Sequence, residues 1–218
     1  MSGVSDITAL PQSLPVFPLA GVVLLPHVQL PLNIFEPRYV AMVDHALRHD
    51  RLIGMIQPRG EDGALFTTGC AGRLTSFQET GDGRYLITLT GLCRFDVTQE
   101  LVTAPQGFRL VQPDWQRWAH DFAPVTDNAV CREKLLEALG PYLEKMQMSC
   151  DQWDAMRSVS CDKLVSTLTM ICPFTAAEKQ MLLEAPTLAD RMKVLGAFLE
   201  NALNDDDCCA GDDAPRCH

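Results

Sequence analysis

The sequence contains no apolar run approaching the roughly 20 residues that a membrane-spanning helix needs. Basic residues are also scarce, because 18 lysines and arginines stand against 28 aspartates and glutamates, and the formal net charge is −10. Phosphate binding needs a clustered basic face, so this balance argues against nucleic acid as a partner. We therefore expect a soluble chain that binds neither membranes nor nucleic acid.

The N-terminal residues lack the basic segment and apolar core of a secretory signal, so we expect a cytoplasmic protein. Nine cysteines are present, but none forms a C-x-x-C pair. Six stand singly among apolar neighbours, and such cysteines are usually small buried hydrophobic residues. These six are Cys70, Cys93, Cys131, Cys150, Cys161 and Cys172.

The other three cysteines lie in an acidic tail, as Cys208, Cys209 and Cys217, followed by His218. Four soft ligands of this kind suit zinc, but their spacing matches no common structural zinc pattern. A frayed tail over residues 204–218 is the expectation.

Motifs for nucleotide hydrolysis and nucleophilic catalysis are absent. No G-x-x-x-x-G-K-[ST] loop, G-x-G-x-x-G fingerprint or G-x-S-x-G elbow occurs. A dyad of Cys70 with His27 has no local signature, although a cryptic cysteine hydrolase stays open as an alternative that thiol reactivity would test. We expect no catalytic residue and no cofactor.

Two histidines have a spacing that suits a metal. His45 and His49 are four residues apart on a predicted helix, which places both imidazoles on one face. No third ligand can be assigned, and a solvated pair is the common outcome for such spacing. We expect no metal site, and keep a small-ligand or metal-sensing domain as the alternative function.

The first half of the chain has the patterns of short strands. Apolar runs at residues 14–19, 22–25 and 30–35 are broken by prolines, which favour edge or irregular strands. An amphipathic helix is predicted from Pro37 to about residue 49, with Glu36 before it at the positive dipole end. Further strands are predicted over residues 52–56, 70–77, 85–90, 93–97 and 108–118, with a hairpin turn at 81–83 and a bulge at Gly91.

The second half has helical periodicity. Apolar stripes predict helices over residues 135–146, 161–171, 176–183 and 188–203, with a shorter helical stretch at 153–156. Gly140 and Pro141 should break or kink the first of them, while Thr175 and Glu178 form a capping box. We therefore expect an α+β chain, with an arm at residues 1–13, a β-rich domain at 14–120, a helical bundle at 121–203 and the tail.

Several segments carry a resemblance to a known family. They are the runs LPVFPL (14–19), GVVLLP (21–26) and LPLNIFEPRY (30–39), then GCAGRL (69–74), the DGR turn (82–84) and GLCRF (91–95). In this order the set is similar to the N-terminal, substrate-binding domain of the Lon (La) protease family. The helical half, with PF at 173–174 and EKQ at 178–180, resembles the bundle of stand-alone bacterial members.

The resemblance implies a PUA-like β pseudo-barrel with one inserted helix, followed by a helical bundle. It also implies binding of polypeptide, because this region helps full Lon proteases to recognise substrates and to oligomerise. The ATPase and Ser-Lys protease domains are not expected within these residues, so a non-enzymatic adaptor or chaperone-like factor is the hypothesis. Its partners would be unfolded or exposed polypeptide, with a protease or a second copy as further candidates.

Seven residues of the recognisable segments are candidate polypeptide contacts: Phe35, Glu36, Arg38, Tyr39, Arg73, Arg94 and Phe95. A competing interpretation is structural, since residues at a helix start often serve capping and packing. A peptide-binding surface should combine exposed apolar side chains with an open strand edge, which pairs with extended main chain. The sequence alone does not distinguish these interpretations.

Overall fold

The computed structural model describes residues 6–60, 62–101, 104–123, 129–145 and 159–204. The chain divides into two compact units: a sheet unit of residues 1–126 and 166–184, and a helical unit of residues 127–165 and 185–218. Strands dominate the first half and helices the second, so the predicted α+β class is confirmed. Within the described ranges, no helix is long and apolar enough to cross a membrane.

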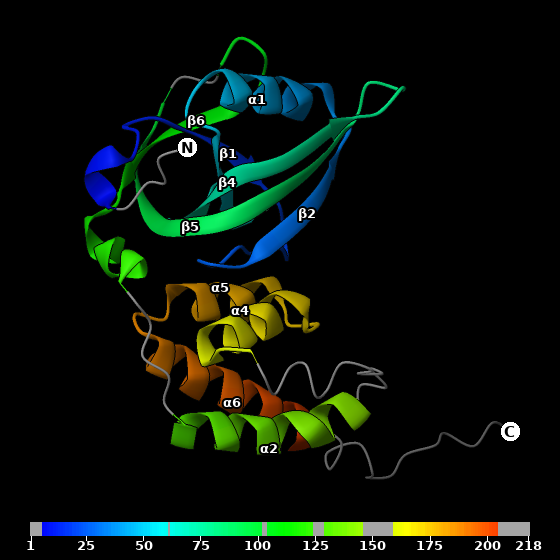
Figure 1. The fold of residues 1–218 in the computed structure, drawn as a ribbon, viewed down its shortest axis with the longest axis vertical. Helices are drawn as coiled ribbons and strands as arrows, with labels where there is room; N and C mark the ends of the chain where they lie inside the picture. Colours follow the sequence, from blue (N-terminus) through cyan, green and yellow to red (C-terminus); the bar gives the residue numbers. More distant parts are fainter. Residues whose placement is uncertain (1–5, 61, 102–103, 124–128, 146–158, 205–218) are drawn as a thin grey trace, which may run out of the picture. The chain divides into compact units, whose positions relative to one another are not determined.

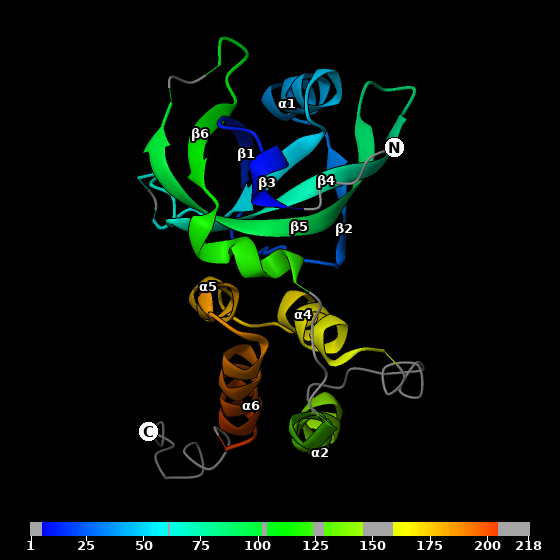
Figure 2. The same ribbon diagram turned by 60° about the vertical axis from the view of Figure 1, so that its left-hand side comes forward.

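The sheet unit is built on six strands in the order β2-β5-β4-β3-β1-β6, with an additional pairing of β5 and β6. The strands are β1 (Leu14–Pro18), β2 (Gln29–Ile34), β3 (Leu52–Ile56), β4 (Thr68–Glu79), β5 (Tyr85–Glu100) and β6 (Arg109–Asp114). β1 and β3 are parallel, and every other pair is antiparallel. Because β6 bonds both β1 and β5, five strands close a ring, and β2 adds to β5 outside it (Figures 1 and 2). This is the predicted pseudo-barrel.

Helix α1 (Pro37–Arg48) begins where the sequence predicts. Pro37 occupies its first turn and Glu36 precedes it in extended conformation. The buried face of the helix joins the main apolar core of the sheet unit, and Figure 2 shows α1 lying over the strands. This face consists of Tyr39, Met42, Val43 and Ala46.

The apolar run at residues 22–25 is not a strand, although Val23, Leu24 and Leu25 are buried and Val22 is half-buried. It is followed by two backbone hydrogen bonds to β5, in which His27 N donates to Gly91 O (2.9 Å) and Gly91 N donates to Val28 O (2.8 Å). The strand prediction was wrong because an apolar run indicates burial, whereas ladder pairing depends on which backbone lies alongside. The bulge predicted at Gly91 is present, since the β4–β5 register shifts between Ala71 and Gly72.

The strand predicted over residues 108–118 is shorter in the structure. β6 ends at Asp114, whose side chain accepts a hydrogen bond from Gln116 N (2.9 Å). A 3-10 helix, η2 (Gln116–Phe122), begins there, and Trp118 is fully buried on it. The apolar pattern continued past the strand because the helical turn also fills the barrel core.

Helix α5 (Ala176–Glu184) belongs to the sheet unit and is joined to it by buried amides. The fully buried Gln57 side chain donates to Ala176 O (2.9 Å) and to Gln180 Oε1 (3.1 Å), and accepts from Gly21 N (2.9 Å). Gln180 Nε2 in turn donates to Thr68 O (3.0 Å). Buried polar groups need such partners, so these bonds fix the position of α5.

The capping box predicted at the start of α5 is confirmed. Glu178 N donates to Thr175 Oγ1 (3.2 Å), and Thr175 N donates to Glu178 Oε2 (2.8 Å). At the start of α6 (Leu188–Asn204), Asp190 N donates to Thr187 Oγ1 (3.1 Å). Side-chain oxygens thus satisfy amides that the first helical turns leave without intrahelical partners.

In the helical unit, α2 (Ala129–Lys145) packs against α6. Lys145 Nζ donates to two carbonyls in the last turn of α6, Ala202 O (2.6 Å) and Leu203 O (3.2 Å). The interruption predicted at Pro141 does not end α2, which continues to Lys145. Helix α4 (Cys161–Ile171) contributes to both units, while the stretch predicted at 153–156 and most of the predicted tail lie outside the described residues.

Candidate functional site

Three large apolar side chains are exposed on β2 and the β4–β5 hairpin. The exposed fractions are 62% for Phe35, 49% for Phe77 and 44% for Leu86. Phe35 follows the last residue of β2, and the other two flank the hairpin turn, which projects beyond the end of α1 in Figure 1. Phe77 pairs with Ile87 and Leu86 pairs with Gln78, so Phe77 and Leu86 lie on opposite faces of the hairpin. Large apolar side chains exposed close together indicate an interaction site more strongly than scattered ones do, and here the site would include both faces of the hairpin.

A shallow hollow of about 440 Å³ lies on the same three strands. The register places Leu86 opposite both Asn33 of β2 and Gln78 of β4, so an apolar side chain stands between two amides. The residues that line the hollow are Pro31, Leu32, Asn33, Ser76, Gln78, Leu86, Ile87 and Thr88. Phe35, Phe77, Leu86 and this hollow are called the hairpin surface below.

The hairpin surface borders two open strand edges. β4 pairs with β3 only over Cys70 to Arg73. Among the described residues, 76–79 therefore have a ladder partner on the β5 side alone, and Thr75 lies at the register shift before them. These five residues are all exposed. β2 ends the strand order and pairs only with β5, but Pro31 removes one donor from its free edge. The distal part of β4 is therefore the better template for an added strand.

Three predicted contact residues lie together where β2 passes into α1. Glu36 and Arg38 form an exposed ion pair of 2.8 Å. The Phe35 ring is exposed beside them, with the Arg84 guanidinium 6.0 Å from its centroid. Arg38 also stacks over the Tyr39 ring at 4.6 Å.

The other four predicted contacts lie deeper. Tyr39 is buried against Phe17, with ring centroids 4.3 Å apart, and burial raises the pKa of its phenol. Arg73 is half-buried on β4. Arg94 is 2% exposed and Phe95 is fully buried. Neither of these last two can contact a ligand on the surface of this structure, so we reinterpret both as residues that hold the barrel together.

The sequence reasoning missed Phe77 and Leu86. A signal was present, because Tyr85, Leu86 and Ile87 are apolar in succession although a half-buried strand alternates. An apolar residue on each face of a strand indicates that both faces contact something.

Comparison with known proteins identifies the family. A model of the ATP-dependent protease La (LON) substrate-binding domain matches residues 13–201. This chain belongs to the Lon substrate-binding domain family.

Relatives and solved structures agree with this assignment. The chain is 29% identical over 202 residues to Lon protease 2 of Myxococcus xanthus, covering 85% of this chain and 23% of that protein. It is 22% identical to Lon protease 1 of Bacillus subtilis, covering 88% and 25%. The chain thus spans about a quarter of the length of these relatives.

Two solved domains show the same fold. A crystal structure of a Lon N-terminal domain protein from Xanthomonas campestris has a TM-score of 0.61 at 26% identity, covering 85% of this chain and 98% of that one. The N-terminal domain of the Mycobacterium avium complex Lon protease has a TM-score of 0.65 at 17% identity, covering 87% and 98%. The part of Lon that this chain matches is the substrate-binding domain, which is non-catalytic.

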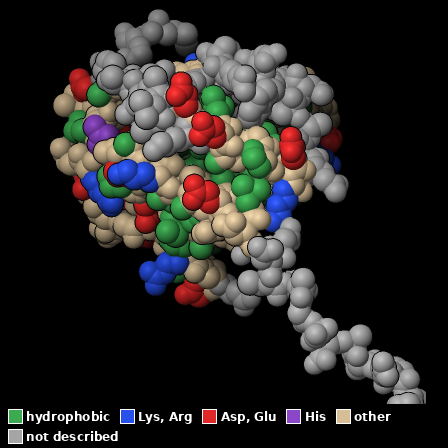
Figure 3. All heavy atoms as spheres, turned by 90° about the horizontal axis from the view of Figure 1, so that it is seen from below, with side chains coloured by type: hydrophobic (Ala, Val, Ile, Leu, Met, Phe, Trp, Pro, Cys, Tyr) green, Lys and Arg blue, Asp and Glu red, His purple; other side chains and the backbone are tan. Residues whose placement is uncertain are grey.

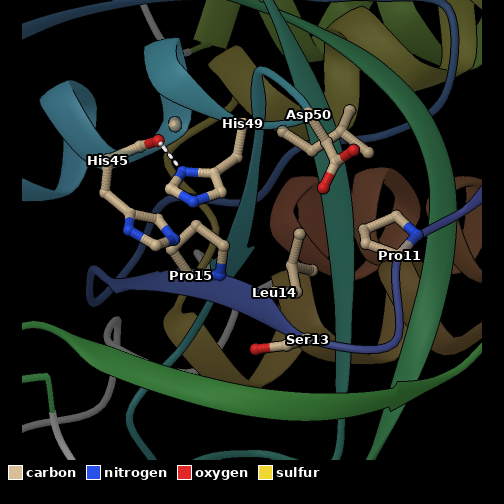
Figure 4. Close-up of a pocket in the computed structure, with 9 residues that line it drawn as sticks. Pro11, Ser13, Leu14, Pro15, His45, His49 and Asp50 are labelled. Carbon is tan, nitrogen blue, oxygen red and sulfur yellow. Dashed lines mark hydrogen bonds between the residues drawn. The ribbon is translucent and has the colours of Figure 1, made fainter.

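A second cavity of this Lon-type domain, about 260 Å³, contains the histidine pair (Figure 4). The two rings stack with centroids 4.1 Å apart, and His49 Nδ1 lies 2.7 Å from His45 O. Burial lowers the pKa of His45, and the neighbouring His49 and Arg48 act in the same direction. In the described ranges no group of three or more His, Cys, Asp or Glu side chains could hold a metal, so the pair has no third protein ligand there.

The cysteines that the structure describes are buried, as predicted: Cys70, Cys93, Cys161 and Cys172. Cys131 and Cys150 lie outside the residues whose side chains are described. Burial raises the pKa of Cys93 to about 12 and that of Cys70 well above its ordinary value. Because only the thiolate is nucleophilic, neither suits the cysteine-hydrolase alternative.

We expect the four buried thiols to react with iodoacetamide at neutral pH at least about 100-fold more slowly in the native protein than in urea, since reaction requires opening of the core. Mass spectrometry of timed samples would measure each site. The rate of each cysteine in urea serves as the reference for the same site in the native protein. Rapid labelling of Cys70 in the native protein would contradict its burial and would support the cysteine-hydrolase alternative.

Proposed function

We propose that this chain binds unfolded or exposed polypeptide at the hairpin surface and acts as an adaptor or chaperone-like factor. The observation that carries the proposal is the open β4 edge at residues 76–79 beside Phe77 and Leu86. Membership of the Lon substrate-binding domain family supports polypeptide as the ligand class. The proposal concerns binding alone and assigns no reaction to the chain.

Two kinds of contact would act together. Exposed apolar side chains of the client bury against Phe35, Phe77 and Leu86, gaining roughly 25 cal/mol for each Å² of apolar area removed from water. The client main chain pairs with the open edge of β4, which gives affinity without requiring one sequence. The rim carries Glu36, Arg38 and Arg84, so clients of either charge find a partner.

Fluorescence anisotropy with labelled, permanently unfolded polypeptides tests the proposal. We expect saturable binding with a micromolar Kd, on the order of −8 kcal/mol, and none to the same polypeptide in folded form. Combining F35S, F77S and L86S should raise Kd at least about 10-fold, because few residues carry most of the binding energy. Weak complexes in which a chain must become ordered on binding have dissociation constants up to tens of micromolar. An absence of binding at that protein concentration would therefore refute the proposal.

A matched control is available on a helix of the same unit. Met181 on α5 is 55% exposed, comparable with Phe35 and Phe77, but lies outside the hairpin surface. M181S should leave Kd within about twofold, since an isolated exposed apolar residue contributes little. An equal loss in M181S would show that binding is not localised to the hairpin surface.

Backbone N-methylation of the client distinguishes strand addition from apolar contact alone. An added strand donates hydrogen bonds to β4 only from alternate residues. Methylating one alternate set of amides should therefore weaken binding much more than methylating the other set. Equal effects from both sets would show that the client does not add a strand to β4. Binding would then depend on apolar contacts alone.

A further inference from the structure

The helical unit has an open apolar groove of about 310 Å³ between α2 and α6. Its floor includes the buried Leu135 and Met192, and its walls are the small residues Ala138, Ala189, Gly196 and Ala197. Lys193 and Glu200 complete the lining. Figure 3, seen from below relative to Figure 1, shows apolar side chains at the surface between acidic and basic ones.

Among the described residues, no close neighbour of Gly196 explains why this position is a glycine. It lies in the middle of α6, where glycine lowers helix stability relative to alanine. A Cβ added at this position would meet no atom within 4 Å, so no neighbouring group requires the glycine. A glycine on an open helix face allows a second backbone to approach closely, because the distance between packed helix axes, about 8–10 Å, depends on the side chains at the contact.

The charges of the groove are complementary to those of the same helix reversed. Lys193 and Glu200 are equidistant in sequence from the midpoint between Gly196 and Ala197. When two copies of α6 cross antiparallel at that midpoint, Lys193 of each faces Glu200 of the other. Among the described residues Lys193 pairs with Asp190, 3.7 Å away on its own helix. Both side chains are exposed, so this ion pair is weak and Lys193 can pair across such a crossing.

We propose that the groove binds α6 of a second copy of this chain, in an antiparallel crossing with its two-fold axis between Gly196 and Ala197. The contact is isologous, so it closes as a dimer and does not propagate. One helix crossing buries less than the roughly 1,200 Å² of stable complexes, so the dimer is weak and forms reversibly at high protein concentration. The dimer joins two polypeptide-binding units without requiring the hairpin surface.

Analytical ultracentrifugation of the full chain under reducing conditions, from about 1 µM to about 1 mM, tests the proposal. The wild-type chain should show a monomer–dimer equilibrium. K193E and E200K each place two like-charge pairs in the crossing and should raise the dimer Kd at least about 10-fold. The double variant K193E/E200K restores both opposite-charge pairs and should return Kd to within about threefold of wild type.

A steric variant separates the crossing from general electrostatics. G196L fills the open face of α6 and should abolish the dimer, while thermal unfolding of the dilute monomer stays unchanged or shifts upward because leucine favours helix. A chain that remains monomeric at about 1 mM would overturn the proposal, as would a dimer that persists equally in G196L and both single charge variants. Failure of the double variant to restore the dimer would also overturn it.

Discussion

Arg94→Ala is expected to lower the free energy of unfolding by about 3–5 kcal/mol, because it leaves Asp121 a buried charge without its partner. The side chains of Arg94 and Asp121 are 3% and 5% exposed, and Arg94 Nη2 lies 2.7 Å from Asp121 Oδ1. Arg94 Nε and the Arg94 backbone amide both donate to Asp121 Oδ2, at 3.0 and 2.9 Å. The fork geometry of the guanidinium makes this pair hard to replace.

R94A should also destabilise elements other than the one that carries Asp121. Arg94 Nη1 donates to Leu183 O (3.1 Å) in α5, and the guanidinium lies 3.8 Å from the Trp118 ring centroid. One side chain thus joins β5, η2 and α5. Hydrogen exchange in R94A should therefore increase at α5, which Arg94 contacts through Leu183 O, more than at α1.

Urea denaturation with a neighbouring arginine as control measures the effect. Arg117 also stacks on Trp118, at 4.4 Å, but its side chain is 53% exposed and its ion pair with Asp96 is 3.4 Å long. R117A should cost at most about 1 kcal/mol. The double variant R94M/D121L removes both charges and should recover part of the R94A loss. Losses of equal size in R94A and R117A would contradict a special role for the buried pair.

Gly91→Ala is expected to cost more than about 3 kcal/mol or to prevent folding, because the added Cβ would overlap backbone. A Cβ at this position would lie 1.9 Å from Leu25 O and 2.7 Å from Leu25 C. Relief would require the segment that precedes β2 to move away. That movement would break the hydrogen bonds of Gly91 to His27 N and Val28 O.

The hairpin turn offers two graded controls for Gly91. Gly81→Ala should be nearly neutral, because a Cβ there meets nothing within 4 Å and no positive φ is involved. Gly83 has a φ of +78° in equally open space, so G83A should cost about 1 kcal/mol from backbone strain alone. Soluble yield and urea midpoints would rank the three variants. A urea midpoint of G91A close to that of G81A would contradict this expectation, because it would show that the Leu25 backbone moves away from the added Cβ at little cost in stability.

Local signals in the sequence predicted the fold best where the cause of a structure is itself local. Pro37 and the apolar stripe that follows predict α1, and the glycines of the 81–83 turn predict the hairpin. The run at residues 22–25 and the end of β6 were mispredicted, because their conformation depends on Gly91 and on the barrel core. Gly140 and Pro141 were expected to break or kink α2, and it does not break there, because it continues to Lys145.

The recognisable motifs indicate fold more than contact. Gly54 and Gly69 make room for the Phe95 ring, since a Cβ at either position would lie within 2.8 Å of it. Arg94 and Gln180 satisfy buried polar groups. Phe35 was found because it adjoins such a motif. Phe77 and Leu86 depend on where β3 stops covering β4, which no local pattern encodes.

The interleaving of the two units constrains how the chain can fold during synthesis. The sheet unit is completed by residues 166–184, so ribosomes produce much of the helical unit before α5 emerges. Until then Gln57 lacks its partners on α5, Ala176 and Gln180, the latter 123 residues later in the chain. At about 5–20 residues per second, the nascent barrel stays uncovered for several seconds, with Gln57 hydrogen-bonded to water and the apolar surface around it exposed. For that interval the nascent chain itself exposes the kind of apolar surface that chaperones bind.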